Sequence, residues 1–157
     1  LNETNQYDEV ESFVEHFQNA LNTVHDITSA DLSISSSEFT DADVGQLFSK
    51  PLPALTTLKL NLASTKITDQ GLEFVLNKIP KTVQNLDLSL DAIETVRSSG
   101  ALVGKYLPQF KNLKNLRLSY ILSGLKNEGG KALVQGLRSL KNIESLTLVL
   151  MGDELTG

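Results

Sequence analysis

Few side chains in this sequence have the types and the spacing that catalysis or ligand binding requires. The segment GLKNEGGKA, residues 124–132, has the glycines and the lysine of a phosphate-binding loop. It does not meet the spacing G-x-x-x-x-G-K-[ST], because Gly130 stands where the lysine belongs and Ala132 follows Lys131. We therefore expect these glycines to serve tight packing rather than a nucleotide.

The other candidates for chemistry are isolated. His16 and His25 lie nine residues apart, a spacing typical of surface or packing residues rather than ligands. Asp41 and Asp43 form an i, i+2 pair, and such a pair does not share a helix face. The sequence has no cysteine, which excludes disulfides, thiolate metal sites and a cysteine nucleophile. These observations predict a protein that is not an enzyme and that binds no cofactor or metal.

Composition is typical of a soluble protein of one domain. The 157 residues are enough to bury a core, and contents of 40% hydrophobic and 21% charged residues are ordinary. No apolar run approaches the roughly 20 residues of a membrane helix, and residues 1–10 lack the blocks of a secretory signal. Together with the lack of cysteine, this predicts a cytoplasmic protein without membrane contact.

Charge is segregated along the chain, although the net charge is only -5. Residues 1–54 hold ten acidic residues and one basic residue, whereas residues 95–143 hold nine basic residues and one acidic residue. In an elongated molecule this produces a field along the long axis. We expect a protein partner with an acidic surface. Nucleic acid is disfavoured because the whole chain is acidic and shows no aromatic RNA-binding motif.

One stretch recurs at a near-constant period. Residues 113–120 read LKNLRLSY, and related stretches begin at residues 27, 55, 83 and 143, so that the starts are 28, 28, 30 and 30 residues apart. Apolar residues alternate within each copy, which predicts strands with one apolar face. The pairs Thr40-Asp41 and Thr68-Asp69 predict helix starts between the strands.

A helix is predicted ahead of the first copy. Residues 5–24 carry one apolar stripe at steps of three or four: Tyr7, Val10, Phe13, Val14, Phe17, Leu21 and Val24. We expect residues 1–26 to cap the first repeat, since the end of a repeat array otherwise leaves an apolar face open. The alternative is a helix that dimerises or binds a target.

The recurring unit L-x-x-L-x-L resembles the leucine-rich repeat. Units of 28 to 30 residues with a full helix resemble the ribonuclease-inhibitor-like subclass, and the extra apolar step in L-x-L-x-L resembles variant repeats of some protist proteins. The resemblance covers residues 27–157. It implies an α/β fold, namely a right-handed α/β solenoid or horseshoe segment with a parallel concave sheet, convex helices and an N-terminal capping helix.

Two parts depart from that pattern. The asparagine position of the family's turn falls at Ser37, Thr65, Ile93, Ser123 and Asp153. Isoleucine offers no polar side-chain group, so we expect the turn of the third repeat, within residues 91–100, to be irregular. The fifth repeat stops where its helix should begin, which predicts that further repeats or a partner cover the end.

Leucine-rich repeats usually bind partners on the concave face, which the resemblance places on the outward residues of the strands. The candidates are Asp31, Lys59, Asn61, Asn85, Asp87, Asn115, Arg117 and Thr147. Acid and base alternate across strands that would lie about 5 Å apart. We favour the interpretation that these charges pair with each other and leave a shallow polar surface of small side chains.

A basic surface on the helices and turns is the competing site. Its candidates are Arg97, Lys105, Lys111, Lys114, Lys126, Lys131, Arg138 and Lys141. Scattered lysines usually belong to a solvated surface, and the functional alternative is docking against an acidic protein or another polyanion.

The sequence therefore predicts a non-catalytic interaction or scaffold module that is part of a larger chain or complex. One alternative is a regulatory domain attached to an enzyme, such as a GTPase-activating or kinase-linked repeat protein. The other is a polyanion-binding surface, which would show a steep loss of affinity with salt.

Overall fold

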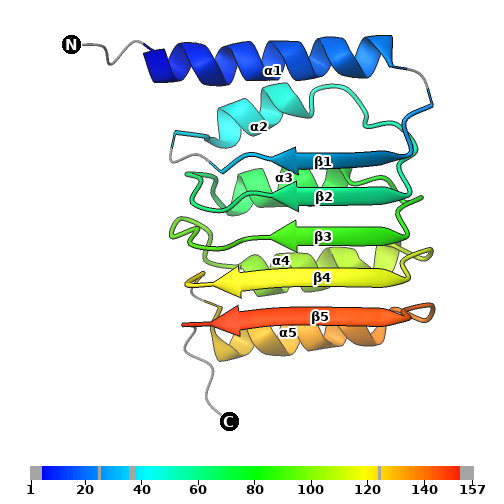
Figure 1. Ribbon diagram of the computed structural model, residues 1–157. Helices are drawn as coiled ribbons and strands as arrows, with labels where there is room; N and C mark the ends of the chain where they lie inside the picture. The colour runs from blue at the N-terminus through cyan, green and yellow to red at the C-terminus, as the bar shows by residue number, and fades with distance from the viewer. Residues whose placement is uncertain (1–4, 25, 36–37, 124, 153–157) are drawn as a thin grey trace.

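Five parallel strands form a single open sheet, and helices alternate with them along the chain (Figure 1). This computed structural model describes residues 5–24, 26–35, 38–123 and 125–152. The elements are α1 (Asn5–Thr23), β1 (Ser29–Ser33), α2 (Asp41–Leu47), β2 (Thr57–Asn61), α3 (Asp69–Lys78), β3 (Asn85–Ser89), α4 (Ser99–Tyr106), the 3-10 helix η1 (Leu107–Gln109), β4 (Asn115–Ile121), α5 (Asn127–Arg138) and β5 (Ser145–Met151). The strands lie side by side in sequence order.

The register of the strands confirms the repeat-like α/β architecture. Leu58, Leu86, Leu116 and Leu146 are direct neighbours in β2, β3, β4 and β5. Alternation along a strand sends the intervening side chains to the opposite face of the sheet. Helices α2 to α5 all lie on one side of the sheet, and the other side is open in the view of Figure 1.

The core lies between the sheet and these helices. Leu58, Leu60 and Leu118 are buried from the sheet side, and Val44 and Leu72 are buried from the helix side. Each fully buried aliphatic side chain of this kind contributes on the order of 1.5–3 kcal/mol. Among the described residues, no helix combines the length and the apolar character that a membrane crossing demands.

The two ends of the stack differ. At one end α1 lies beside α2 (Figure 1), and its Val14 is buried against the core. At the other end β5 is the last strand of the sheet, and its Leu146, Leu148 and Leu150 stay 47%, 38% and 39% exposed. Residues 153–157, where the next helix was predicted to begin, lie outside the described residues, as does the turn position Ser37.

Acidic residues at the helix starts connect neighbouring repeats. Thr68 precedes α3, and its hydroxyl accepts a hydrogen bond from the backbone N–H of Gln70, as the sequence predicted for a cap. The carboxylate of Asp41 accepts the backbone N–H of Thr68 at 2.8 Å. One repeat later, Asp69 accepts the backbone N–H groups of Arg97 and Ser98 at 2.9 and 3.0 Å. These aspartates therefore hold the start of the following helix as well as favouring their own.

A left-handed backbone residue follows β2, β3, β4 and β5. These residues are, in strand order, Ser64, Ala92, Leu122 and Gly152, and their φ angles are 58°, 52°, 53° and 72°. Only glycine adopts this conformation without steric cost. The first three positions are therefore strained turns that the flanking strands hold in place.

The turns after the strands differ at the predicted asparagine positions. Thr65 replaces the asparagine by donating its hydroxyl to the carbonyl of Leu62 at 2.9 Å. Ile93 is buried in the core instead. The connection that contains it, residues 90–98 between β3 and α4, is longer than the connection 62–68 between β2 and α3.

Helices α4 and α5 pack with their backbones in contact. A Cβ atom at Gly104 would lie 2.3 Å from the carbonyl oxygen of Ala132, and one at Gly136 would lie 2.4 Å from that of Gly104. A Cβ at Gly100 would meet the backbone of Gly129 at 2.5 Å. Gly129 thus serves close packing, in agreement with its interpretation from the sequence, and Gly124 lies outside the described residues.

This packing predicts that Gly104→Ala destabilises the fold by about 1–3 kcal/mol, because the added methyl group forces backbone apart. Gly45→Ala in α2 is the matched control. Nothing lies within 4 Å of a Cβ at Gly45, so this change should be neutral or stabilise by up to about 1 kcal/mol. Urea unfolding followed by circular dichroism measures both, and equal effects of the two changes would contradict the backbone contact.

The strained turn predicts that Ala92→Gly stabilises the fold by roughly 0.5–1 kcal/mol, since relief of the left-handed strain outweighs the added freedom of the unfolded chain. Ala101→Gly in helix α4 is the control and should destabilise by about 1 kcal/mol. The same urea experiment decides between them. A loss of stability in both variants would show that residue 92 is not strained.

Candidate functional site

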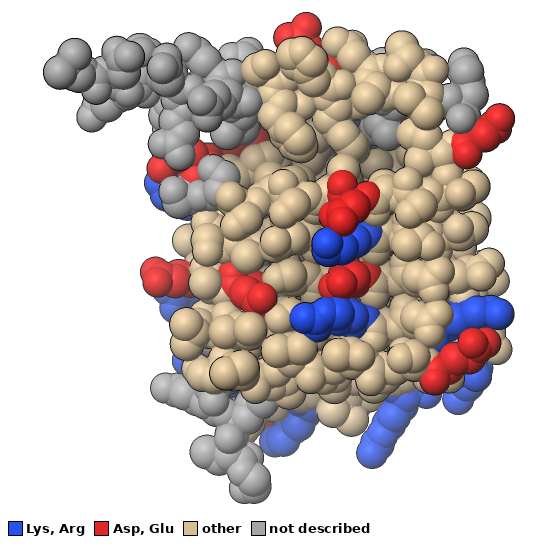
Figure 2. Space-filling model, viewed as in Figure 1, with Lys and Arg blue, Asp and Glu red and all other residues tan. Residues whose placement is uncertain are grey.

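The open face of the sheet carries polar side chains in rows that cross the strands. The central row contains Asp31, Lys59, Asp87, Arg117 and Thr147, which are register partners in successive strands. Figure 2 shows acidic and basic side chains alternating in a column across this face. We call the outward residues of β1 to β5 the sheet face.

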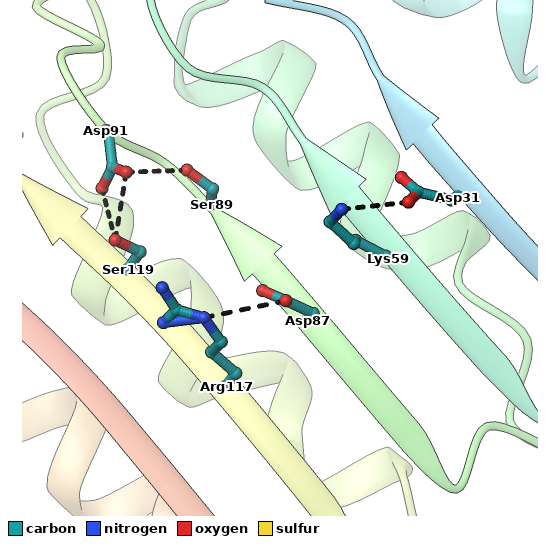
Figure 3. A network of polar contacts seen from close by, with 7 residues as sticks. All are labelled: Asp31, Lys59, Asp87, Ser89, Asp91, Arg117 and Ser119. Carbon is teal, nitrogen blue, oxygen red and sulfur yellow. Dashed lines mark hydrogen bonds and ion pairs between the residues drawn. The ribbon is translucent and has the colours of Figure 1, made fainter.

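The charges of the central row form two ion pairs (Figure 3). The ammonium of Lys59 lies 2.9 Å from a carboxylate oxygen of Asp31, and Nε of Arg117 lies 3.7 Å from one of Asp87. The hydrogen bond to Asp31, and then its charge, raise the pKa of Lys59. These are the pairs that the alternation of charges predicted. Because Asp31, Lys59 and Arg117 are exposed and Asp87 is partly exposed, each pair contributes no more than about 1 kcal/mol.

A row of amides runs beside the charges. Asn115 donates from Nδ2 to Oδ1 of Asn85 at 2.6 Å, and Asn85 donates to the hydroxyl of Thr57 at 3.0 Å. Asn61 lies on the other side of the central row and donates to Ser33 at 3.3 Å. The central row and the row of Asn85 and Asn115 line a shallow open hollow of about 310 Å³, whose walls include Lys59, Asp87 and Arg117. All eight sheet-face candidates are thus brought onto one surface.

Asp91 ties β3 to β4 at the end of this face (Figure 3), although no sequence pattern selects it. Its carboxylate accepts the hydroxyls of Ser89 at 2.9 Å and of Ser119 at 2.8 Å. It also accepts the backbone N–H of Ile121 at 2.7 Å. The equivalent residues of the neighbouring repeats are Ala63 and Ile121, so the repeat gives no signal at this position.

The eight basic residues predicted as a docking surface come from several helices and connections. They lie before α4 (Arg97), in α4 (Lys105), between η1 and β4 (Lys111, Lys114), before and in α5 (Lys126, Lys131, Arg138) and before β5 (Lys141). Three are paired with acids: Lys105 with Glu73 at 2.6 Å, Lys114 with Glu144 at 3.4 Å and Lys131 with Glu128 at 3.0 Å. The other five make no ion pair with a described residue.

The Lys105–Glu73 pair belongs to a polar link between α3 and α4. Tyr106 also donates to Glu73, at 3.2 Å. The hydrogen bonds from Lys105 and then from Tyr106 lower the pKa of Glu73. Burial, and then the bond to Glu73, raise the pKa of Tyr106. These three side chains form an ion pair and a hydrogen bond with one another, and they therefore connect two neighbouring repeats.

The remaining sequence candidates do not converge. His16 is exposed on α1, where its ring contacts the backbone oxygen of Ser12 one turn earlier, and His25 lies outside the described residues. Within the part of the chain that the structure describes, no three His, Cys, Asp or Glu side chains are grouped to hold a metal ion. Comparison with protein-family models and with curated proteins found no match to this chain.

The contacts of Asp91 predict that Asp91→Ala destabilises the fold by about 1.5–3 kcal/mol, because two hydroxyls and one N–H lose a charged acceptor. Asp87→Asn is the control. It removes the ion pair between Asp87 of β3 and Arg117 and should change the free energy of unfolding by less than about 1 kcal/mol. Thermal and urea unfolding measure the difference. Equal losses would mean that Asp91 contributes no more than a surface charge.

Proposed function

We propose that the chain is part of a leucine-rich repeat solenoid of the ribonuclease-inhibitor-like type and works as a non-catalytic protein-interaction or scaffold module. The 28- to 30-residue period, the L-x-L-x-L strands and their parallel register support this proposal. In it, the solenoid is right-handed, the sheet face is its concave side, and α1 is the cap at one end. A protein partner binds the sheet face.

The observation that carries the proposal is the register of polar side chains on the sheet face. The five central residues come from five different strands, yet each stands beside the next. Ion pairs and amide hydrogen bonds join these side chains across the strands. A partner therefore meets a surface whose polar groups are already ordered, and binding loses less side-chain freedom than on an unconnected surface.

The chemistry of this face favours a partner that inserts a polar or acidic group into the shallow hollow. Lys59 stands between two acids, Asp31 and Asp87. Arg117 has an acid on one side only, because its other neighbour is Thr147. Arg117 also forms the longer of the two ion pairs, so its guanidinium has donors left for a carboxylate of the partner. Lys114 lies just before the same strand, where its ammonium is 3.4 Å from the carboxylate of Glu144.

The proposal predicts that reversing charge on this strand, with Arg117→Glu and Lys114→Glu together, weakens partner binding by roughly tenfold or more, because like charges across an interface cost several kcal/mol. Lys81→Glu is the control for a charge reversal outside the strands, since Lys81 is exposed in the connection between α3 and β3.

The measurement is affinity for proteins that are cross-linked to the wild-type chain, identified by mass spectrometry and then purified. Binding should also weaken as salt rises. If the double variant binds with the affinity and salt dependence of the wild type, the sheet face is not the binding surface.

A further inference from the structure

The β5 end of the stack is an apolar groove with basic side chains at its rim. Leu148 and Leu150 of β5 and Leu133, Val134 and Leu137 of α5 line it, and its volume is about 740 Å³. Lys131 and Arg138 line the same groove. Figure 2 shows basic side chains projecting from this end of the molecule. We call this surface, with Leu146, the end face.

Interior positions of the repeat make up the end face. Leu116 and Leu118 of β4 are the register partners of Leu146 and Leu148, and both are at most 2% exposed. Nothing described lies over the same positions of β5, which are more than a third exposed. An apolar patch of this kind, rimmed by charge, is typical of an interaction site.

The opposite end of the molecule offers a matching surface on α1. Phe13, Phe17, Ala20 and Val24 recur at steps of four, three and four, so they share one stripe of the helix. Phe13 and Val24 are 41% and 52% exposed, and the rings of Phe13 and Phe17 are stacked with centroids 6.3 Å apart. Val14 is buried in the core of its own molecule and Phe17 packs partly against that core, so Phe13 and Val24 are the exposed part of the stripe.

The α1 end is acidic and the β5 end is basic, so the two ends attract each other. Glu15 is exposed on α1, and residues 1–54 carry ten acids against one base. Arg138 stands at the end face without an ion pair to a described residue, and Lys131 stands there paired with Glu128, in a region with nine bases against one acid. Two end faces brought together would instead set these bases against their own copies, which disfavours pairing of like ends.

We propose that a second copy of this chain covers the end face, and that the α1 stripe of one copy lies in the β5–α5 groove of the next. Helix α1 and the β5–α5 pair lie at opposite ends of one stack (Figure 1), so one molecule can use both in contacts with two others. A helix across the end of the stack is an arrangement that the chain already uses, because α1 lies beside α2 at the β1 end. The contact is heterologous, so copies add head to tail.

Two single substitutions test this proposal in the 157-residue chain. Leu148→Asp blocks the end face and leaves α1 intact, whereas Phe13→Asp blocks α1 and leaves the end face intact. Sedimentation velocity should show that the mass of the wild type grows with protein concentration and falls with salt. Each variant alone should associate at least tenfold more weakly. An equimolar mixture of the two should form a dimer and no larger species, since each partner retains one complementary end.

Controls separate this contact from unfolding and from the sheet face. Phe74→Asp places the same charge on an exposed apolar residue of α3 and should leave association unchanged. Arg138→Glu alters only an exposed side chain at the groove and should weaken association without loss of the circular dichroism spectrum. Arg117→Glu, on the sheet face, should have no effect on association, so this proposal and the proposed function fail separately.

Three results would overturn the proposal. The first is a wild-type chain that stays monomeric at every concentration. The second is a mixture of the two variants that does not form a dimer although both are folded. The third is association that survives Phe13→Asp but not Leu148→Asp, which would indicate edge-to-edge pairing of β5 between two copies.

Discussion

Strands β1 to β4 each depend on the next repeat to bury their leucines. Leu116 and Leu118 are shielded because β5 and α5 stand beside β4 and α4, and the same holds one repeat earlier for Leu86 and Leu88. Stability in such a stack is close to a sum of contacts between neighbours. Its weak points are therefore the two ends, and here they are treated differently: α1 lies across one, and the other keeps its leucines exposed.

The same periodicity turns single residues into rows on the sheet face. One outward position per repeat is enough to set Asp31, Lys59, Asp87 and Arg117 side by side. The exposed pairs in this row add little stability, so their charges stay available to a ligand. Asp91, in contrast, contributes to stability. It is partly buried and bonded to both neighbouring strands, and it holds β3 and β4 together where their turns begin.

The features that repeat are the ones that the sequence predicts. The leucine pattern predicted the strands and their register, and the threonine–aspartate pairs predicted the starts of α2 and α3. Features that occur once, or that depend on backbone shape, left no pattern. Asp91 has no equivalent in the flanking repeats. Ser64, Ala92 and Leu122 share a left-handed conformation without sharing a side chain that favours it. The contact of Gly104 with Ala132 depends on how closely two helices approach, which spacing alone does not encode.

The sheet face and the two ends of the stack lie on different sides of the molecule. The sheet face looks out from the side of the stack, whereas the α1 stripe and the end face lie at its two ends (Figure 1). Covering an end therefore leaves the sheet face free. Head-to-tail addition would also bring the sheet faces of several copies into one assembly. A partner with several binding segments could then bind several of these faces at once. Binding the first face raises the effective concentration at the second, so a shallow polar surface of modest affinity gains strength from repetition. Within one chain, repeated strands place weak polar groups side by side on the sheet face. Head-to-tail copies would repeat that face along the assembly in the same way.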